Sequence, residues 1–346
     1  MPILTSAARS LTMESCPSRI SKIMKPEEFI QSKLERLSTK SEIKSFSQKQ
    51  DLEAEIYRLL MNKKFRKYSV TPEYQKHIKK AISLNVDRNL PIKLTFPFGG
   101  YKLWRLKETP EVDWAELFTL IYYTNWLSPI CDIYPAGVWF NFYSDDFIVP
   151  RMNNIERTDV DSYRHTFQNL LLFLNKYLPD NLKFTLTRVI DQYKNIEEFE
   201  TDLHEKIAEA EKEFNANPTI NEKMRTQISL NVKPTDKQTL DTHWLERTHI
   251  LHQAYLRVKY KRPYYRTEDN ILAFSSPITD SIAVGTTKRS IAKFWCGVGV
   301  LEKEGDTYHD LVLSPKQSED IEFEKYDMSI SGLTGKNFNS IKINKC

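Results

Sequence analysis

The sequence KLTFPFGGYKLWR, residues 93–105, joins an apolar segment to two glycines and two cations. Gly99 and Gly100 allow a tight turn that brings backbone amides close to a ligand. Lys102 and Arg105 follow, and such cations neutralise carboxylate or phosphate groups. The stretch matches neither the GxxxxGK[ST] phosphate loop nor the GxGxxG dinucleotide fingerprint. It therefore predicts a substrate-binding loop for an anion, with an ordinary tight turn as the alternative.

Hydroxyl and carboxyl groups end the next apolar segment, GVWFNFYSDD. Ser144 is a candidate substrate-binding residue, and Asp145 or Asp146 could hold a substrate ammonium through charge-assisted hydrogen bonds. A Mg²⁺ ion or a loop-capping role is the alternative for these carboxylates. Glu116 lies at the start of a predicted helix. Because burial raises carboxyl pKa values toward neutrality, Glu116, Asp145 and Asp146 are the candidate catalytic residues.

Alternating strands and helices must position these groups. Strand patterns cover residues 90–98, 137–146 and 181–191, and helical patterns cover 50–65, 72–89, 110–134 and 159–178. This alternation is typical of an α/β, Rossmann-like fold with a mainly parallel sheet and crossover helices. We expect late strands within 271–313 to complete or extend that sheet, with a hairpin turn at Gly305. The carboxyl ends of parallel strands form a ligand crevice, so the glycines and the acids should share one hollow.

The chain divides into three predicted regions. Residues 1–50 are rich in Ser and Lys and should form a leader that is partly disordered and precedes the core. Residues 51–318 should form an α/β catalytic domain, with a helical insertion at about 195–260. Residues 319–346 are polar and should form an irregular C-terminal tail.

Composition excludes several classes of protein. The 346 residues are 40% hydrophobic and 12% aromatic, which suffices for a substantial core. No apolar run reaches the roughly 18 residues of a membrane span, so we expect no membrane contact. The 4 cysteines lie far apart without a CxxC pair, which favours a cytoplasmic protein without disulfides or bound metal. A formal charge of +4 does not require nucleic acid but suits a phosphate-bearing substrate. We expect no cofactor.

Cations alternate with tyrosines in RVKYKRPYYR, which begins at Arg257. Single-stranded nucleic acids bind to such surfaces because cations meet the backbone and rings stack on bases. Arg257, Lys259, Lys261 and Arg262 are therefore candidate RNA or phosphate contacts. The alternative is a basic helix end that complements the helix dipole before Pro263.

The order of these motifs resembles the isocyanide (isonitrile) synthase family, also called pyoverdine/dityrosine biosynthesis proteins. That family has Phe-Pro-x-Lys-Ser-x-Asn, Leu-Pro-Asp…Glu, Tyr-x-Pro-Gly and Ser-Asp-Gly motifs. This chain has FPFGGYK, TPEVDWAE, IYPAGV and YSDDF, followed by VDSYRHTF. The likeness spans about residues 66–315. It departs where Gly-Gly-Tyr-Lys replaces Lys-Ser-x-Asn, Asp146 replaces a glycine and Cys296 replaces a histidine.

The resemblance implies a transferase- or lyase-type enzyme of specialised metabolism that acts on the amino group of an amino acid. Enzymes of that family join this nitrogen to a carbon taken from a pentose phosphate. On this hypothesis Lys102 and Arg105 anchor an anionic group and Asp145 holds the ammonium, so Lys102→Ala should raise KM without unfolding the protein. Two alternatives stay open: a tRNA-dependent aminoacyl-transfer enzyme such as a cyclodipeptide synthase, and a non-catalytic binding protein.

Overall fold

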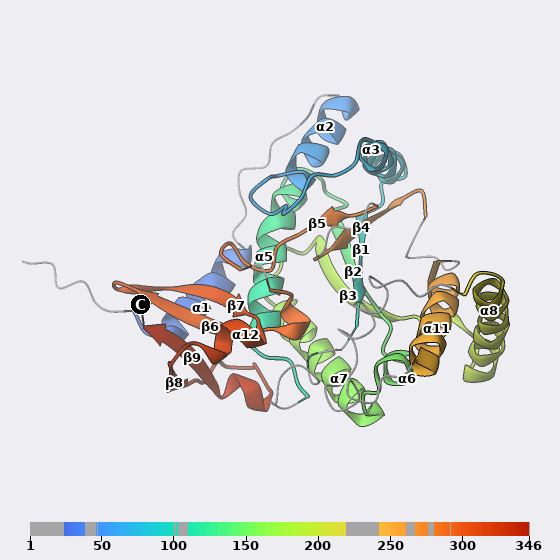
Figure 1. Ribbon diagram of the computed structural model, residues 1–346. Coiled ribbons are helices and arrows are strands. Elements are labelled where there is room, and N and C mark those ends of the chain that lie inside the picture. The colour runs from blue at the N-terminus through green and yellow to red at the C-terminus, as the bar shows by residue number, and fades with distance from the viewer. Residues whose placement is uncertain are drawn as a thin grey trace, which may run out of the picture.

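Two β-sheets joined through helices form the protein (Figure 1). The computed structural model describes residues 24–38, 46, 48–99, 102, 110–218, 242–260, 267–275, 280–290 and 292–345. None of the helices in these ranges combines the length and apolar character needed to cross a bilayer.

The first sheet is parallel, as the sequence predicts. Its strand order is β3-β2-β1-β4-β5, with β1 Ile92–Phe98, β2 Val138–Ser144, β3 Leu182–Arg188, β4 Asn270–Phe274 and β5 Ile282–Ala283. The register runs from Ile92 opposite Val138 to Phe98 opposite Ser144, so β1 and β2 end level with each other. The segments that follow these two strands therefore start side by side at the carboxyl edge of the sheet.

Helices cover this sheet and separate its strands. They are α2 Lys49–Leu60, α3 Pro72–Asp87, α5 Trp114–Cys131, α6 Val149–Asn153, α7 Arg157–Leu174, α8 Ile196–Ala216 and α11 Thr242–Tyr260. α5 is apolar on all sides and almost wholly buried, which is expected for a helix enclosed by other elements. In Figure 1, α8 and α11 lie together beyond the parallel sheet, at the place of the predicted helical insertion.

Aromatic rings fill the core between the parallel sheet and its helices. Phe96 and Phe142 have ring centroids 5.7 Å apart, and Phe98 and Phe167 have centroids 4.5 Å apart. The short 3-10 helix Phe294–Cys296 joins this cluster, because the Phe294 ring stacks on that of Phe98 at 6.0 Å. Packing of this kind holds the ends of β1 and β2 in fixed positions.

The late strands divide between the two sheets, which corrects the prediction that all of them join the first. Only β4 and β5 extend the parallel sheet. β6 Val298–Glu304 and β7 Thr307–Leu313 form a second sheet with β8 Phe323–Asp327 and β9 Ser340–Lys345, in the order β7-β6-β9-β8. The turn between β6 and β7 contains Gly305 with φ of 60°, so the predicted hairpin is confirmed.

The predicted irregular tail is wrong, since β8 and β9 lie within it. β8 has the sequence FEKYD, none of whose residues is buried, so no alternation of apolar residues marks it as a strand. In β9 Ile341 and Ile343 are buried, and both pack in the main core. Ile341 and Ile343 alternate with polar residues, which is a strand pattern, and pairing with β6 and β8 completes the strand.

Part of the predicted leader is also folded. α1, Pro26–Glu35, buries Phe29, Ile30 and Leu34, and the Phe29 ring lies 5.9 Å from that of Tyr308 in β7. A ten-residue helix is marginal by itself, so its apolar face is stable only because the second sheet covers it. Residues 1–23, 39–45 and 47 of the leader lie outside the described residues.

The second sheet contacts the first turn of α5 at a glycine. A Cβ atom on Gly299 of β6 would lie 2.2 Å from the Ala115 nitrogen and 2.3 Å from the Trp114 carbonyl carbon. Nearby, the Trp114 indole nitrogen donates to the Ser340 carbonyl of β9 at 2.8 Å. Only glycine allows β6 to approach the helix backbone this closely.

We predict that Gly299→Ala strongly destabilises the protein, because backbone atoms must separate to admit the methyl group. Thermal unfolding followed by circular dichroism measures the loss. Gly305→Ala is the control, since nothing lies within 4 Å of its would-be Cβ and its positive φ should cost only about 1 kcal/mol. Equal melting temperatures for Gly299→Ala and the wild type would contradict the close contact.

Candidate functional site

Gly99 and the acidic segment after β2 meet at the carboxyl edge of the parallel sheet. Gly99 follows β1 and is buried, and the Asp145 backbone nitrogen donates to the Phe98 carbonyl at 3.0 Å. Ser144 ends β2 and is also buried. The first two strands therefore bring together segments that are about 45 residues apart in the chain, as the parallel-sheet prediction requires.

A buried charge cluster lies at this edge. The Lys102 ammonium is 2.7 Å from Asp113 Oδ1 and 2.7 Å from Glu116 Oε2, and the three residues are at most 4% exposed. Tyr163 of α7 donates its hydroxyl to Glu116 Oε1 at 2.8 Å. We call Lys102, Asp113, Glu116 and Tyr163 the lysine cluster.

The start of α5 determines the positions of the two carboxylates. Asp113 is the N-cap and accepts from the Ala115 backbone nitrogen at 2.6 Å, while Glu116 accepts from the Asp113 backbone nitrogen at 2.8 Å. The two carboxylates form a capping box, which the sequence shows as an acid pair three residues apart. The sequence does not show that Lys102 pairs with these carboxylates, because this contact follows no local pattern.

Burial and unequal charge set the protonation of the lysine cluster. Burial, the largest influence, and the nearby Asp113 together outweigh the lowering effect of Lys102, so the pKa of Glu116 is raised to about 7. For Lys102, burial lowers the pKa, but Asp113 and Glu116 outweigh burial and raise it above its ordinary value. Two carboxylates thus share one cation, and a proton on Glu116 makes the cluster neutral. Glu116 therefore changes its protonation state near neutral pH.

Tyr163 stays protonated beside this carboxyl group. Burial raises its pKa well above 10, and the nearby Glu116 raises it further. The hydroxyl is thus a fixed hydrogen-bond donor to Glu116.

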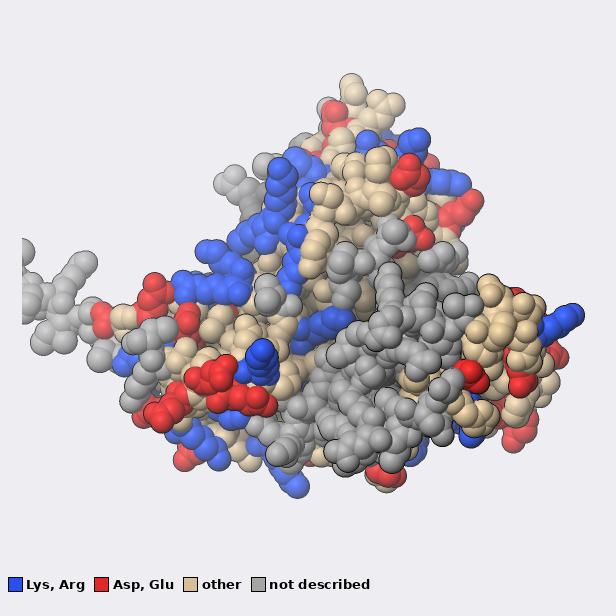
Figure 2. Space-filling view, in the orientation of Figure 1, with Lys and Arg blue, Asp and Glu red and all other residues tan. Residues whose placement is uncertain are grey.

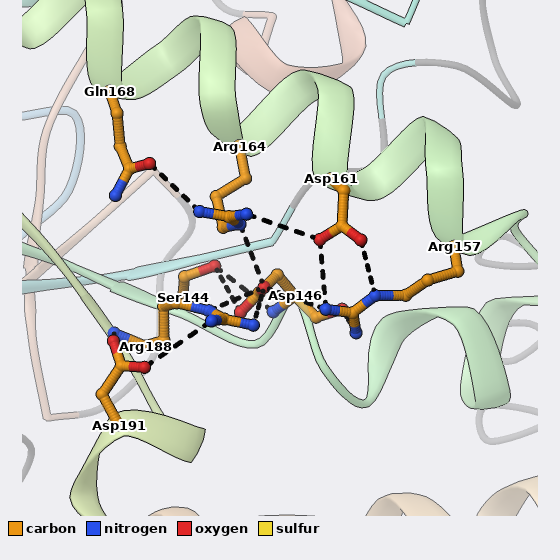
Figure 3. A network of polar contacts seen from close by, with 8 residues as sticks. All are labelled: Ser144, Asp146, Arg157, Asp161, Arg164, Gln168, Arg188 and Asp191. Atoms are coloured by element: carbon orange, nitrogen blue, oxygen red, sulfur yellow. Dashed lines mark hydrogen bonds and ion pairs between the residues drawn. The ribbon is translucent and has the colours of Figure 1, made fainter.

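A second cluster surrounds Asp146 on the same edge (Figure 3). Arg188, at the end of β3, approaches Asp146 Oδ2 with Nη2 at 2.9 Å and Nε at 3.0 Å. From α7, Arg164 Nε lies at 3.4 Å and Arg157 Nη2 at 3.8 Å from the same oxygen. We call these four residues the arginine cluster. One buried carboxylate therefore orients three guanidinium groups from two elements.

Two further carboxylates, Asp161 and Asp191, pair with arginines of the cluster from its outer side. Asp161 accepts from Arg157 at 2.9 and 3.1 Å, and Asp191 lies 3.6 Å from Arg188. The side chains of Asp161 and Asp191 are 38% and 50% exposed, in contrast to the 2% of Asp146. Solvent or an anionic ligand can replace the outer pair, whereas Asp146 stays in place.

The remaining candidates are distributed as follows. Asp145 is half-buried, and its backbone carbonyl accepts from the nitrogens of Ile148 and Val149 at the start of α6. Ser144 Oγ accepts from the Asp146 backbone nitrogen at 3.2 Å. Gly100 and Arg105 lie outside the described residues.

The basic stretch after α11 is described only at its start. Arg257 forms ion pairs with Glu213 and Glu209 of α8, so its charge is balanced within the protein. The side chain of Lys259, and Lys261 and Arg262 as a whole, lie outside the described residues.

Sequence reasoning missed the arginines. Arg188 ends the third strand, so its place at the carboxyl edge of the sheet follows from the strand pattern. Arg157 and Arg164 are seven residues apart and so lie on one face of α7, next to the second strand's end. Within the described part of the chain, no three His, Cys, Asp or Glu residues are grouped as a metal site.

Comparisons with known proteins identify the fold. No protein-family model and no curated protein matches the sequence. Among solved structures, the PvcA protein from Pseudomonas aeruginosa is similar with a TM-score of 0.58 and 14% identity. The match covers 85% of this chain and 99% of the PvcA chain. The chain thus has the predicted Rossmann-like α/β fold, and it shares that fold with PvcA along nearly the whole PvcA chain.

The structure changes the expected effect of Lys102→Ala. Removing this ammonium leaves two buried carboxylates unpaired, so we predict a loss of about 3–5 kcal/mol in the free energy of unfolding. Urea denaturation measures it. Lys183→Ala, at an exposed position of β3, should change stability by about 0.5 kcal/mol or less. If both variants unfold at the same urea concentration, Lys102 does not hold the cluster together.

Glu116 should make stability depend on pH. Its pKa rises from 4.5 to about 7 on folding, so its stabilising contribution is complete below pH 4.5 and is lost as pH rises through 7. Urea denaturation at each pH gives the free energies of unfolding of the wild type and of Glu116→Gln. We predict that the wild-type value minus the variant value falls between pH 4.5 and pH 7. The same difference for Glu319→Gln, an exposed carboxylate, should stay flat.

Proposed function

We propose that the protein is a biosynthetic enzyme of the isonitrile synthase type, which acts on the amino group of an amino acid at the carboxyl edge of the parallel sheet. The fold shared with PvcA supports this class. The observation that carries the proposal is the buried carboxyl group of Glu116, whose pKa of about 7 suits general acid-base catalysis at that edge.

The two clusters suggest separate roles. Glu116 gains and loses the proton, and Lys102 and Asp113 set its pKa. Asp145, half-buried beside the end of β1, holds the substrate ammonium. Gly99, which has no side chain, is the proposed backbone contact of the substrate between these groups.

The arginine cluster is the proposed site for a phosphate-bearing co-substrate such as a pentose phosphate. Guanidinium groups bind phosphate through paired hydrogen bonds, and Asp146 holds three of them in position. A phosphate group displaces the exposed carboxylates of Asp161 and Asp191 and takes over their contacts. Asp146 therefore orients the arginines instead of contacting the substrate.

The test incubates the purified protein with an amino-acid mixture and ribulose 5-phosphate, and in parallel with aminoacylated tRNA, and identifies new products by mass spectrometry. A product whose nitrogen comes from the amino acid, formed only with the sugar phosphate, supports the proposal. A product formed only from aminoacylated tRNA would replace it with the second candidate, a tRNA-dependent transfer enzyme. Absence of any product would favour a binding protein.

Arg188→Gln should raise the KM for ribulose 5-phosphate about 10- to 100-fold, because one charged hydrogen-bonding partner is lost. The KM for the amino acid should change much less, and steady-state kinetics with each substrate varied in turn measures both. The matched control is Arg151→Gln, whose guanidinium pairs with Glu200 on α8. A uniform effect on both KM values would contradict the phosphate assignment.

A further inference from the structure

A band of Lys and Arg crosses the surface shown in Figure 2, without Asp or Glu among it. In Figure 1 this region is where the loop after α2 meets the segment between β5 and β6. Neither segment contains an acidic residue, whether over 62–70 (NKKFRKYSV) or over 284–293 (VGTTKRSIAK). The band therefore has a strong local charge in a chain whose formal net charge is only +4.

Backbone hydrogen bonds join the two segments. Arg66 and Val284 form an antiparallel β-bridge. The Lys67 nitrogen donates to the Ala283 carbonyl at 2.9 Å, and the Gly285 nitrogen donates to the Phe65 carbonyl at 2.9 Å. The cations of both segments thus lie on one continuous surface.

The core holds this surface in place. The buried Phe65 ring lies 4.9 Å from that of Tyr122 in α5, and the Tyr122 hydroxyl donates to the Lys64 carbonyl at 2.7 Å. Arg66 is fixed as well, since it donates to the carbonyls of Met61 and Tyr68 at 3.0 Å each. A ligand that binds here meets a backbone and one guanidinium group that the fold already holds in position.

Most of these cations have no carboxylate partner in the described part of the chain. Arg289 pairs with Glu302 and Glu304, and Lys293 lies over the rings of Phe274 and Trp295, so we leave these two out. The others with no such partner are Lys63, Lys64, Arg66, Lys67 and Lys288, which we call the basic surface. Lys67 is half-buried, and burial lowers its pKa, so a nearby anion would stabilise its charged form.

We propose that the basic surface binds the phosphate backbone of RNA along a single-stranded segment. Tyr68 lies beside the cations and is 50% exposed, which offers a ring on which a base can stack. An anionic membrane is less suited, because peripheral membrane binding also needs an inserted apolar face. Tyr68 is the one large hydrophobic side chain exposed there among the described residues, the others being Leu90, Leu172 and Ile196 elsewhere.

The basic surface differs from the candidate RNA-binding stretch that begins at Arg257. Glu213 of α8 balances the charge of Arg257. The inference goes beyond the proposed enzyme activity and does not depend on it. If the protein does take its amino acid from tRNA, the basic surface is where that RNA would bind.

The experiment measures fluorescence anisotropy of a labelled single-stranded oligouridine titrated with the full chain at several KCl concentrations. Five phosphate contacts predict a slope of log K against log salt of about −3 to −4. The triple variant Lys63→Ala/Lys64→Ala/Lys288→Ala should reduce the steepness of that slope by about 2 and weaken binding at low salt at least tenfold. Unchanged binding by this variant would overturn the proposal.

Controls separate charge number from position and RNA from other anions. Lys183→Ala/Lys316→Ala/Lys325→Ala removes three exposed lysines from other surfaces and should bind like the wild type. Tyr68→Ala should weaken binding of oligouridine but not of inorganic polyphosphate, which has no bases.

Binding to vesicles of phosphatidylserine and phosphatidylcholine without binding to oligouridine would replace RNA with a membrane. The variant Lys63→Ala/Lys64→Ala/Lys288→Ala should have the same activity toward free amino acid and ribulose 5-phosphate as the wild type. The RNA proposal and the enzyme proposal can therefore fail separately.

Discussion

The first turn of α5 is the point on which the rest of the structure depends. Asp113 and Glu116 close the helix start and together hold the Lys102 ammonium in the interior. Trp114 follows Asp113 directly. Its indole nitrogen donates to the Ser340 carbonyl of β9, and its backbone contacts Gly299 of β6. A single helix terminus thus joins the carboxyl edge of the parallel sheet to the second sheet. Any change that moves this turn alters both sheets and the protonation of Glu116 together.

Two charge clusters with different balance lie on that edge. The lysine cluster has two carboxylates for one cation and is closed to solvent, so its excess charge appears as a raised pKa of Glu116. The arginine cluster has one buried carboxylate among three guanidinium groups, and its other carboxylates are exposed. The first is therefore suited to holding a proton, and the second to exchanging a partner anion. Burial, rather than residue type, separates the two capacities.

α5 also links this edge to the basic surface. Its first turn forms the lysine cluster, and Tyr122, two turns later, fixes the loop of Phe65 and Lys64. The cations of that loop lie near Lys288 because Arg66 forms a β-bridge with Val284, which is far away in the chain. Their arrangement on the surface is thus a consequence of core packing.

Local patterns determined the parallel sheet, its crossover helices, the capping box of α5 and the hairpin at Gly305, since each depends on neighbours within a few residues. The same patterns placed Gly99, Ser144 and Asp145 at one edge, because parallel strands share a direction. Only the tertiary structure decided that Lys102 pairs with Glu116, that three arginines meet Asp146, and that α1 and β8 are folded. These features depend on contacts between distant segments, and burial there supplies both the folding energy and the pKa shift, which no local spacing records.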